Sequence, residues 1–258
     1  MGKEKLQSGK PDSLKGSFYA NPIHDSAQST IEMRERFPEY TSPNTWPSEQ
    51  ILPGFESIFK ELGRVIVDTG ALVARACDKY ASQNMKDYPS CYLENIILKS
   101  TTTKARLLHY FPPQDLDLKG GSIADDYCDS WCGEHLDHSA LTGLTSAIFI
   151  NEKGTYEPIL SPDQKAGLYV RSRSGKTFQV QIPSHCVAFQ TGEALELASG
   201  GQFRAVPHYV YGGDPSKMKG VARNTLAVFM QPALDDILPG VNSTFADFAA
   251  GILDKGIV

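Results

Sequence analysis

The sequence has no long apolar run. No stretch reaches the roughly 18–20 consecutive apolar residues that a membrane-spanning helix needs, and the polar residues 1–25 lack the apolar core of a secretory signal peptide. Basic residues are also few, since 25 Lys and Arg stand against 30 Asp and Glu for a net charge of −5. The positive excess typical of proteins that bind nucleic acid or anionic membranes is therefore missing. We expect a cytoplasmic protein with neither kind of partner.

A disulfide framework is missing as well. The five cysteines are odd in number and irregularly spaced, which favours free thiols in a reducing compartment. Cys128 and Cys132 form a Cys-x3-Cys pair, but the sequence has no second pair. We therefore predict no structural zinc site.

Two patterns of apolar spacing divide the chain. Residues 1–50 are rich in proline and loop signals and resemble an extended arm. From about residue 50, apolar residues recur every three or four positions, which predicts a long amphipathic helix. The residues expected on its packed face are Phe55, Ile58, Phe59, Leu62, Val65, Ile66, Thr69, Leu72, Val73 and Ala76.

After about residue 95 the apolar period changes to two, which predicts short strands separated by turns. The expected strands are NIILKSTT, KARLLHYF, TSAIFI, GLYVRS, TFQVQI, CVAFQT, FRAVPHYVY and NTLAVFMQP, and STFADFAAGILDKG predicts a final helix. We therefore expect a mainly β fold, an antiparallel barrel or sandwich with a supporting helix. The expected parts are an N-terminal arm and helical region (1–90), a β domain (91–235) and a C-terminal helix (236–258).

The stretch HLDH places candidate metal ligands at the start of the β region. His135 and Asp137 are two residues apart, so on a strand both side chains face the same side. His208, in another expected strand, is the best third ligand. Two histidines and one carboxylate form the facial triad of non-haem Fe(II) oxygenases, which leaves three positions on the metal open. His138 faces the other side, and we expect it to be no ligand.

A single His-x-Asp occurs often by chance, so a second signal is needed. Arg223 follows His208 by fifteen residues and opens an apolar strand, with Thr225 two residues later. An arginine that points inward from such a strand needs an anionic partner. A dicarboxylate cosubstrate would supply one.

The motifs HLDHSALTGLT, FRAVPHYV and RNTLAVFMQP, in that order, resemble the 2-oxoglutarate- and Fe(II)-dependent dioxygenases, most of all the isopenicillin N synthase-like members. The resemblance covers roughly residues 100–235. It implies a double-stranded β-helix, or jelly-roll, with the long helix backing its larger sheet. It also implies that His135, Asp137 and His208 ligate Fe(II), and that Arg223 and Thr225 hold the distal carboxylate of 2-oxoglutarate. With O2, such an enzyme oxidises a C–H bond of a small-molecule substrate and releases succinate and CO2.

The chain departs from the family before the His-x-Asp segment. The family often carries NYYPP there, whereas this sequence has LHYFPP. The resemblance then implies that His109 and Tyr110 contact the cosubstrate, while Phe111 lacks the hydroxyl of the family's second tyrosine. The family's extended N-terminal strand is also not evident.

Three alternatives therefore stay open. The chain could be an oxidase that does not use 2-oxoglutarate, or a truncated family member that binds metal without catalysis. It could also be a cupin-like metal-binding module, although such a module has no need for the Arg223-x-Thr225 pair.

Overall fold

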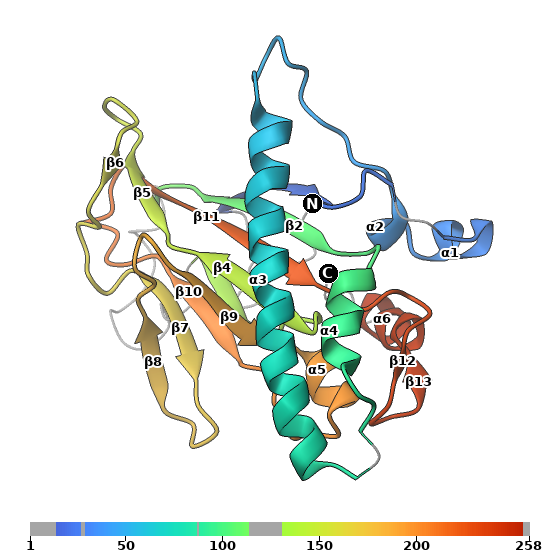
Figure 1. The fold of residues 1–258 in the computed structure, drawn as a ribbon. Helices are drawn as coiled ribbons and strands as arrows, with labels where there is room; N and C mark the ends of the chain where they lie inside the picture. Colours follow the sequence, from blue (N-terminus) through green and yellow to red (C-terminus); the bar gives the residue numbers. More distant parts are fainter. Residues whose placement is uncertain (1–13, 27–28, 87, 114–130, 255–258) are drawn as a thin grey trace.

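The fold was analysed in a computed structural model that describes residues 14–26, 29–86, 88–113 and 131–254. Its strands form two main antiparallel sheets (Figure 1). The larger sheet has the order β1 (Lys15–Ala20), β2 (Lys104–Tyr110), β11 (Val221–Met230), β4 (Leu141–Thr145) and β9 (Val187–Thr191), with β5 (Ile148–Asn151) beside β11 and β6 (Pro158–Ile159) beside β5. The smaller sheet has the order β3 (Cys132–His135), β10 (His208–Tyr211), β7 (Gly167–Arg171) and β8 (Thr177–Val180).

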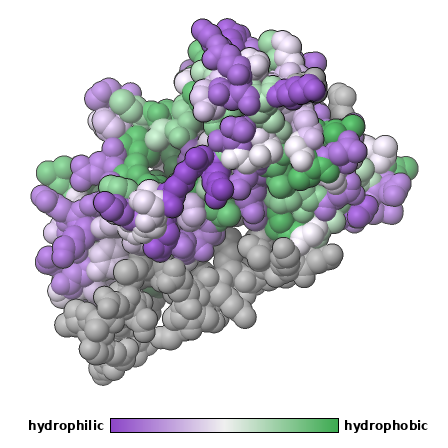
Figure 2. All heavy atoms as spheres, turned by 90° about the horizontal axis from the view of Figure 1, so that it is seen from below, coloured by the Kyte–Doolittle hydropathy of each residue, from purple (hydrophilic) through white to green (hydrophobic). Residues whose placement is uncertain are grey.

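The helices and a short hairpin complete the described fold. The helices are α1 (Ile31–Arg36), α2 (Pro38–Thr41), α3 (Phe55–Asn84), α4 (Tyr92–Lys99), α5 (Glu193–Ala198) and α6 (Phe245–Asp254), and the hairpin pairs β12 (Ile237–Leu238) with β13 (Ser243–Thr244). Among the described residues, none of these helices is both long and apolar enough to cross a membrane. Viewed from the end where α3 finishes, the surface is largely polar, with apolar residues gathered in separate patches (Figure 2).

Apolar side chains from both main sheets meet in one core. Leu108 of β2 and Ala227 of β11 pack in the same cluster as Leu168 of β7 and Val210 of β10. The two sheets therefore face each other, which is the arrangement of a jelly-roll. The mainly β, antiparallel fold predicted from the sequence is confirmed at this level.

The long helix α3 crosses the outer face of the larger sheet (Figure 1). Small residues let it approach closely: a Cβ at Gly70 would collide with Met230 Sδ, and one at Gly143 of β4 would collide with Ile66. A side chain at either glycine would require Met230 or Ile66 to move, and because both are fully buried, the packed interior absorbs the extra volume poorly.

The expected packed face of α3 is wrong in part. Ile58, Leu62, Val65 and Leu72 are exposed. The buried face includes Phe59 and Ile66 from the expected set, together with Gly63, Val67, Gly70, Ala71, Ala74, Asp78 and Ala81. The predicted helix is present, but its apolar residues form two stripes along its surface. The stripe that contains the small residues is the one that packs against the larger sheet.

The expected strand at NIILKSTT is also wrong, because its first five residues, 95–99, lie in α4. Leu93, Ile96 and Ile97 are buried at helical spacing. The buried carboxylate of Asp78 on α3 accepts hydrogen bonds from the backbone N–H groups of Leu93 (2.9 Å) and Glu94 (3.0 Å). Asp78 thus satisfies donors that the first turn of a helix leaves unpaired.

The N-terminal arm contributes a strand that was not evident from the sequence. β1 pairs antiparallel with β2 along its whole length, from Lys15 opposite Tyr110 to Ala20 opposite Ala105. The expected strand TSAIFI is replaced by β4 and β5, which both pair with β11. The short helix α5 was not predicted. Cys128 lies outside the described residues, and so does the end of the predicted final helix.

Candidate metal centre

Three of the predicted ligands lie together at one end of the space between the sheets. His135 is the last residue of β3, Asp137 follows in the next loop, and His208 is the first residue of β10, where it pairs with His135. Asp137 Oδ1 lies 3.8 Å from His135 Nε2 and 3.6 Å from His208 Nε2. Two atoms that each lie about 2.1 Å from one ion are at most about 4.2 Å apart. Both distances therefore fit a shared metal ion, and this is the one such cluster among the described residues.

Backbone carbonyls set the orientation of both histidines. His135 Nδ1–H donates to the carbonyl of Gly133 (2.7 Å), and His208 Nδ1–H donates to the carbonyl of Val206 (2.9 Å). These bonds place the proton on Nδ1 and leave the Nε2 lone pair of each ring directed toward Asp137. A fixed tautomer of this kind is the usual condition for a histidine metal ligand.

Asp137 is held by two further side chains. Its Oδ2 accepts hydrogen bonds from Thr142 Oγ1 (2.7 Å) and from the amide of Gln190. The Gln190 amide nitrogen also lies 3.2 Å from His208 Nε2. The partial positive charge of this amide therefore lies between the Asp137 carboxylate and the His208 ring, which shows that this position favours positive charge.

The electrostatics of the cluster favour a cation. Burial raises the pKa of Asp137, but the nearby His208 and His135 and the hydrogen bonds from Thr142 and Gln190 outweigh it, so the pKa lies below its usual value. Burial lowers the pKa of His208, with Asp137 opposing the shift. An ionised carboxylate and a neutral imidazole are the forms that bind metal. The side chain of His135 is 37% exposed, so the cluster meets solvent on that side.

A cavity of about 60 Å³ connects this cluster to Arg223 on β11. Arg223 is only 5% exposed, and its Nε and Nη1 have no hydrogen-bond partner among the residues that the structure describes. Its guanidinium lies 5.3 Å from the centre of the Tyr110 ring. Leaving a buried charge unpaired costs several kcal/mol, so the geometry calls for an anion beside Arg223. A second cavity of about 460 Å³ adjoins the first and also reaches Arg223.

The remaining predicted contacts divide into two groups. Thr225 and Tyr110 line the cavity with Arg223. His109 does not, because alternate residues of β2 face opposite sides of the sheet. It lies on the other face, where its Nδ1 contacts Asn224 Oδ1 (2.7 Å) and its Nε2 contacts Glu152 Oε1 (2.9 Å). The structure therefore places His109 away from this cavity and gives its assignment to the cosubstrate no support. Phe111 is 42% exposed and packs against the His109 ring.

No protein-family model matches the sequence, and no curated protein is similar to it. Solved structures do match. A Caulobacter crescentus protein assigned to the 2OG-Fe(II) oxygenase family superposes with a TM-score of 0.65 at 20% identity, over 93% of this chain and 70% of that one. A full-length Neurospora crassa protein, in complex with alpha-KG, gives 0.61 at 21% identity over 93% of this chain, which spans 62% of its length. JOX2, in complex with 2OG, Fe and JA, gives 0.60 at 16% identity, over 97% of this chain and 63% of that one.

The chain has the fold of the 2-oxoglutarate- and Fe(II)-dependent oxygenases. The resemblance read from the motifs is thus confirmed at the level of the fold. Within this oxygenase fold, the sequence pointed to the three clustered ligands but missed Gln190 and Thr142, which hold Asp137. A glutamine within the apolar strand CVAFQT was the signal available for Gln190.

Proposed function

We propose that the protein is an Fe(II)- and 2-oxoglutarate-dependent oxygenase that oxidises a C–H bond of a small molecule and releases succinate and CO2. The observation that carries the proposal is Arg223, whose buried Nε and Nη1 are unpartnered on the wall of the cavity that also holds the His135–Asp137–His208 cluster. A guanidinium matches a carboxylate in shape and charge. 2-Oxoglutarate has a carboxylate at each end, one of them part of a 2-oxo acid. The distal carboxylate would meet Arg223, and the 2-oxo acid would meet the metal cluster at the other end of the cavity.

The residues divide the work of binding. His135, Asp137 and His208 would hold Fe(II) on one side and leave positions open on the other. When bound, the iron with 2-oxoglutarate and O2 supplies the oxidation of the substrate. Arg223 would orient the distal carboxylate, with Thr225 beside it on the same face of β11. Apolar side chains such as Leu108, Leu144 and Val210 line the cavity between them and limit the entry of water.

One alternative has a specific observation in its favour. Neither His109 nor Phe111 lines the cavity, so the contacts that the family makes from these positions are absent. In an oxidase that does not use 2-oxoglutarate, a carboxylate of the substrate itself would satisfy Arg223. The two proposals differ in whether 2-oxoglutarate binds at all.

An anaerobic titration of the Fe(II)-loaded protein with 2-oxoglutarate distinguishes them. Chelation of the iron by 2-oxoglutarate gives a visible charge-transfer absorption, which we expect in the wild-type protein. The band should be lost in His135→Ala and kept in His138→Ala, because His138 bonds to Glu193 and lies outside the cluster. Iron binding without a band would favour the oxidase. A failure to bind iron would contradict both.

A further inference from the structure

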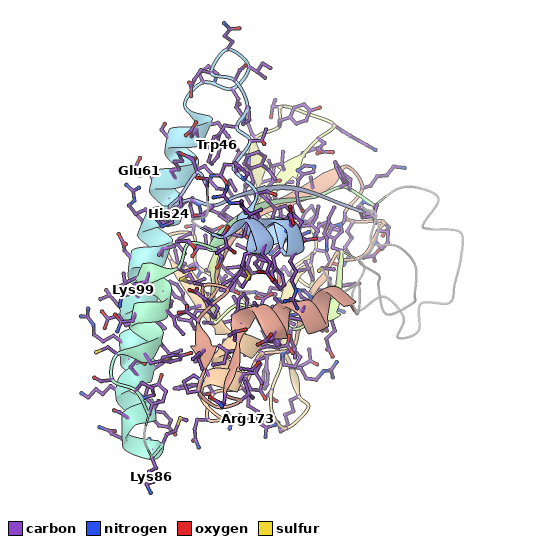
Figure 3. The ribbon with its side chains drawn as sticks, turned by 90° about the vertical axis from the view of Figure 1, so that its right-hand side faces the viewer. His24, Trp46, Glu61, Lys86, Lys99 and Arg173 are labelled. Atoms are coloured by element: carbon purple, nitrogen blue, oxygen red, sulfur yellow. The ribbon has the colours of Figure 1, made fainter. Side chains whose placement is uncertain are left out.

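The outer face of α3 carries a continuous apolar stripe. No other part of the described chain covers this stripe. The stripe, called here the exposed seam, consists of Ile58, Leu62, Val65, Thr69, Leu72 and Ala76, all exposed. The exposed fractions are 64% for Ile58, 55% for Val65 and 58% for Leu72. Figure 3 shows α3 at the edge of the molecule, with the neighbouring Glu61 pointing away from the body. Single exposed apolar residues are common, but a row of them marks an interaction site.

The spacing of the seam identifies the kind of surface that fits it. Successive members are four, three, four, three and four residues apart, which is the a/d repeat of a helix that packs against another helix. At a rise of about 1.5 Å per residue, the seam is roughly 27 Å long. The other face of α3 already packs on the larger sheet, so the helix has one face for its own fold and one for a partner helix.

We propose that the exposed seam binds the same seam of a second copy of this chain, with the two α3 helices antiparallel. A twofold axis brings the same surface of both copies together, so the seam must fit a second seam that runs in the opposite direction. In this arrangement Ile58 meets Ala76 of the second copy, Leu62 meets Leu72, and Val65 meets Thr69. Each pair joins a larger side chain at one end to an equal or smaller one at the other.

The charges beside the seam select this orientation. Glu61 and Arg75 flank the seam on the same side, and in the antiparallel register Glu61 of each copy lies opposite Arg75 of the other. The Arg75 side chain is 62% exposed even though its Nε and Nη2 bind Glu94. In a parallel pair, Glu61 would instead face the flank that carries Phe59 and Ile66, which are buried against the sheet. Only the antiparallel pair therefore matches opposite charges.

The same register predicts one unfavourable contact. Asp68 lies midway between Glu61 and Arg75, so near the axis it approaches Asp68 of the second copy. Like charges so placed weaken an association. We therefore expect a reversible dimer whose strength depends on the charge at position 68, which gives the proposal a directional test.

Sedimentation velocity on the full-length chain tests the association from low micromolar to several hundred micromolar protein. The mass of the wild-type protein should rise from 28.3 kDa toward twice that value. Leu62→Glu should stay monomeric at every concentration. Phe178→Glu, which changes an exposed apolar residue on β8 instead, should associate like the wild type. Matched circular dichroism spectra and melting temperatures would establish that the variants fold.

Charge variants and cross-linking then test the orientation. Asp68→Asn should tighten the dimer by about two- to fivefold, while Glu61→Lys should weaken it. Adding Arg75→Glu to Glu61→Lys should restore association. A mixture of Val65→Cys and Thr69→Cys proteins should form a mixed disulfide above the background of the wild-type cysteines. A wild-type protein that stays monomeric, or a dimer indifferent to Leu62→Glu, overturns the proposal. Cross-linking of Ile58→Cys with itself overturns the antiparallel orientation, because in that orientation the two residues lie at opposite ends of the seam, roughly 27 Å apart.

Discussion

Replacing Arg223 with methionine should change stability and ligand binding in opposite directions. Arg223 is buried, two of its nitrogens have no partner, and its main neighbour is the Tyr110 ring. Burial lowers the pKa of Arg223, and Tyr110 opposes part of that shift. An uncompensated buried charge costs about 3–5 kcal/mol, and a cation–π contact returns about 0.5–2 kcal/mol. Without ligand, the free energy of unfolding of Arg223→Met should therefore exceed that of the wild type by about 1–4 kcal/mol, so the variant is the more stable protein.

The ligand acts in the opposite direction. At a concentration of 2-oxoglutarate about 100 times its Kd, binding stabilises the wild-type protein by about 2.7 kcal/mol. Arg223→Met should lose nearly all of this increment, because the distal carboxylate then has no cation to meet. Urea unfolding under anaerobic conditions with Fe(II), with and without 2-oxoglutarate, measures both quantities when the m-value is unchanged.

Arg171→Met is the matched control. Arg171 binds Glu134 at 2.6 Å, but its side chain is 40% exposed, so its loss should cost at most about 1 kcal/mol and leave the 2-oxoglutarate increment intact. The reasoning is refuted if Arg223→Met is less stable than the wild type without ligand, or if it keeps the increment.

Three further predictions concern the fold. Asp78→Ala should lower the free energy of unfolding by about 2–3 kcal/mol, because it leaves helix N–H donors unsatisfied; urea titration measures this, and a loss below about 0.5 kcal/mol contradicts the capping role. Gly70→Ala should cost about 1–3 kcal/mol by overpacking, and an unchanged melting temperature would show that the helix can shift freely. Hydrogen bonds from Lys60 and then Trp46 lower the pKa of Asp25 from 3.8 to about 2. The contribution of Asp25 should therefore be complete above about pH 4 and vanish as the pH falls through about 2. Asp25→Asn should accordingly destabilise by at most about 1 kcal/mol at neutral pH, since Asp25 is 60% exposed, and the difference from the wild type should shrink as the pH falls from 4 toward 2. A difference that stays constant over this range would contradict this origin.

The candidate metal ligands could be anticipated because each lies at or beside a strand end that local patterns reveal. His208 stands at the start of a strand rich in aromatic and β-branched residues, and His135 and Asp137 precede another. Arg223 was informative for the same reason, since a charged residue in an apolar strand needs a partner. Each of these signals comes from a few neighbouring residues, so it can be recognised in the sequence alone.

The errors come from interactions across long sequence distances. NIIL is a short apolar run that fits a strand or a helix equally well, and the deciding contact comes from Asp78. His109 was placed by motif position, whereas the pairing of β2 with β11 sets which of its residues face the cavity. Gln190 is 53 residues from Asp137, so no local pattern could join them.

The two histidine rings are each oriented by the carbonyl two residues earlier in the chain, at Gly133 and Val206. Such a bond uses only the backbone, so it depends on the path of the chain and not on which side chains stand at those positions. The surrounding sequence can therefore drift while the direction of each ligand atom is kept. A site built in this way therefore tolerates replacement of most of the residues around it.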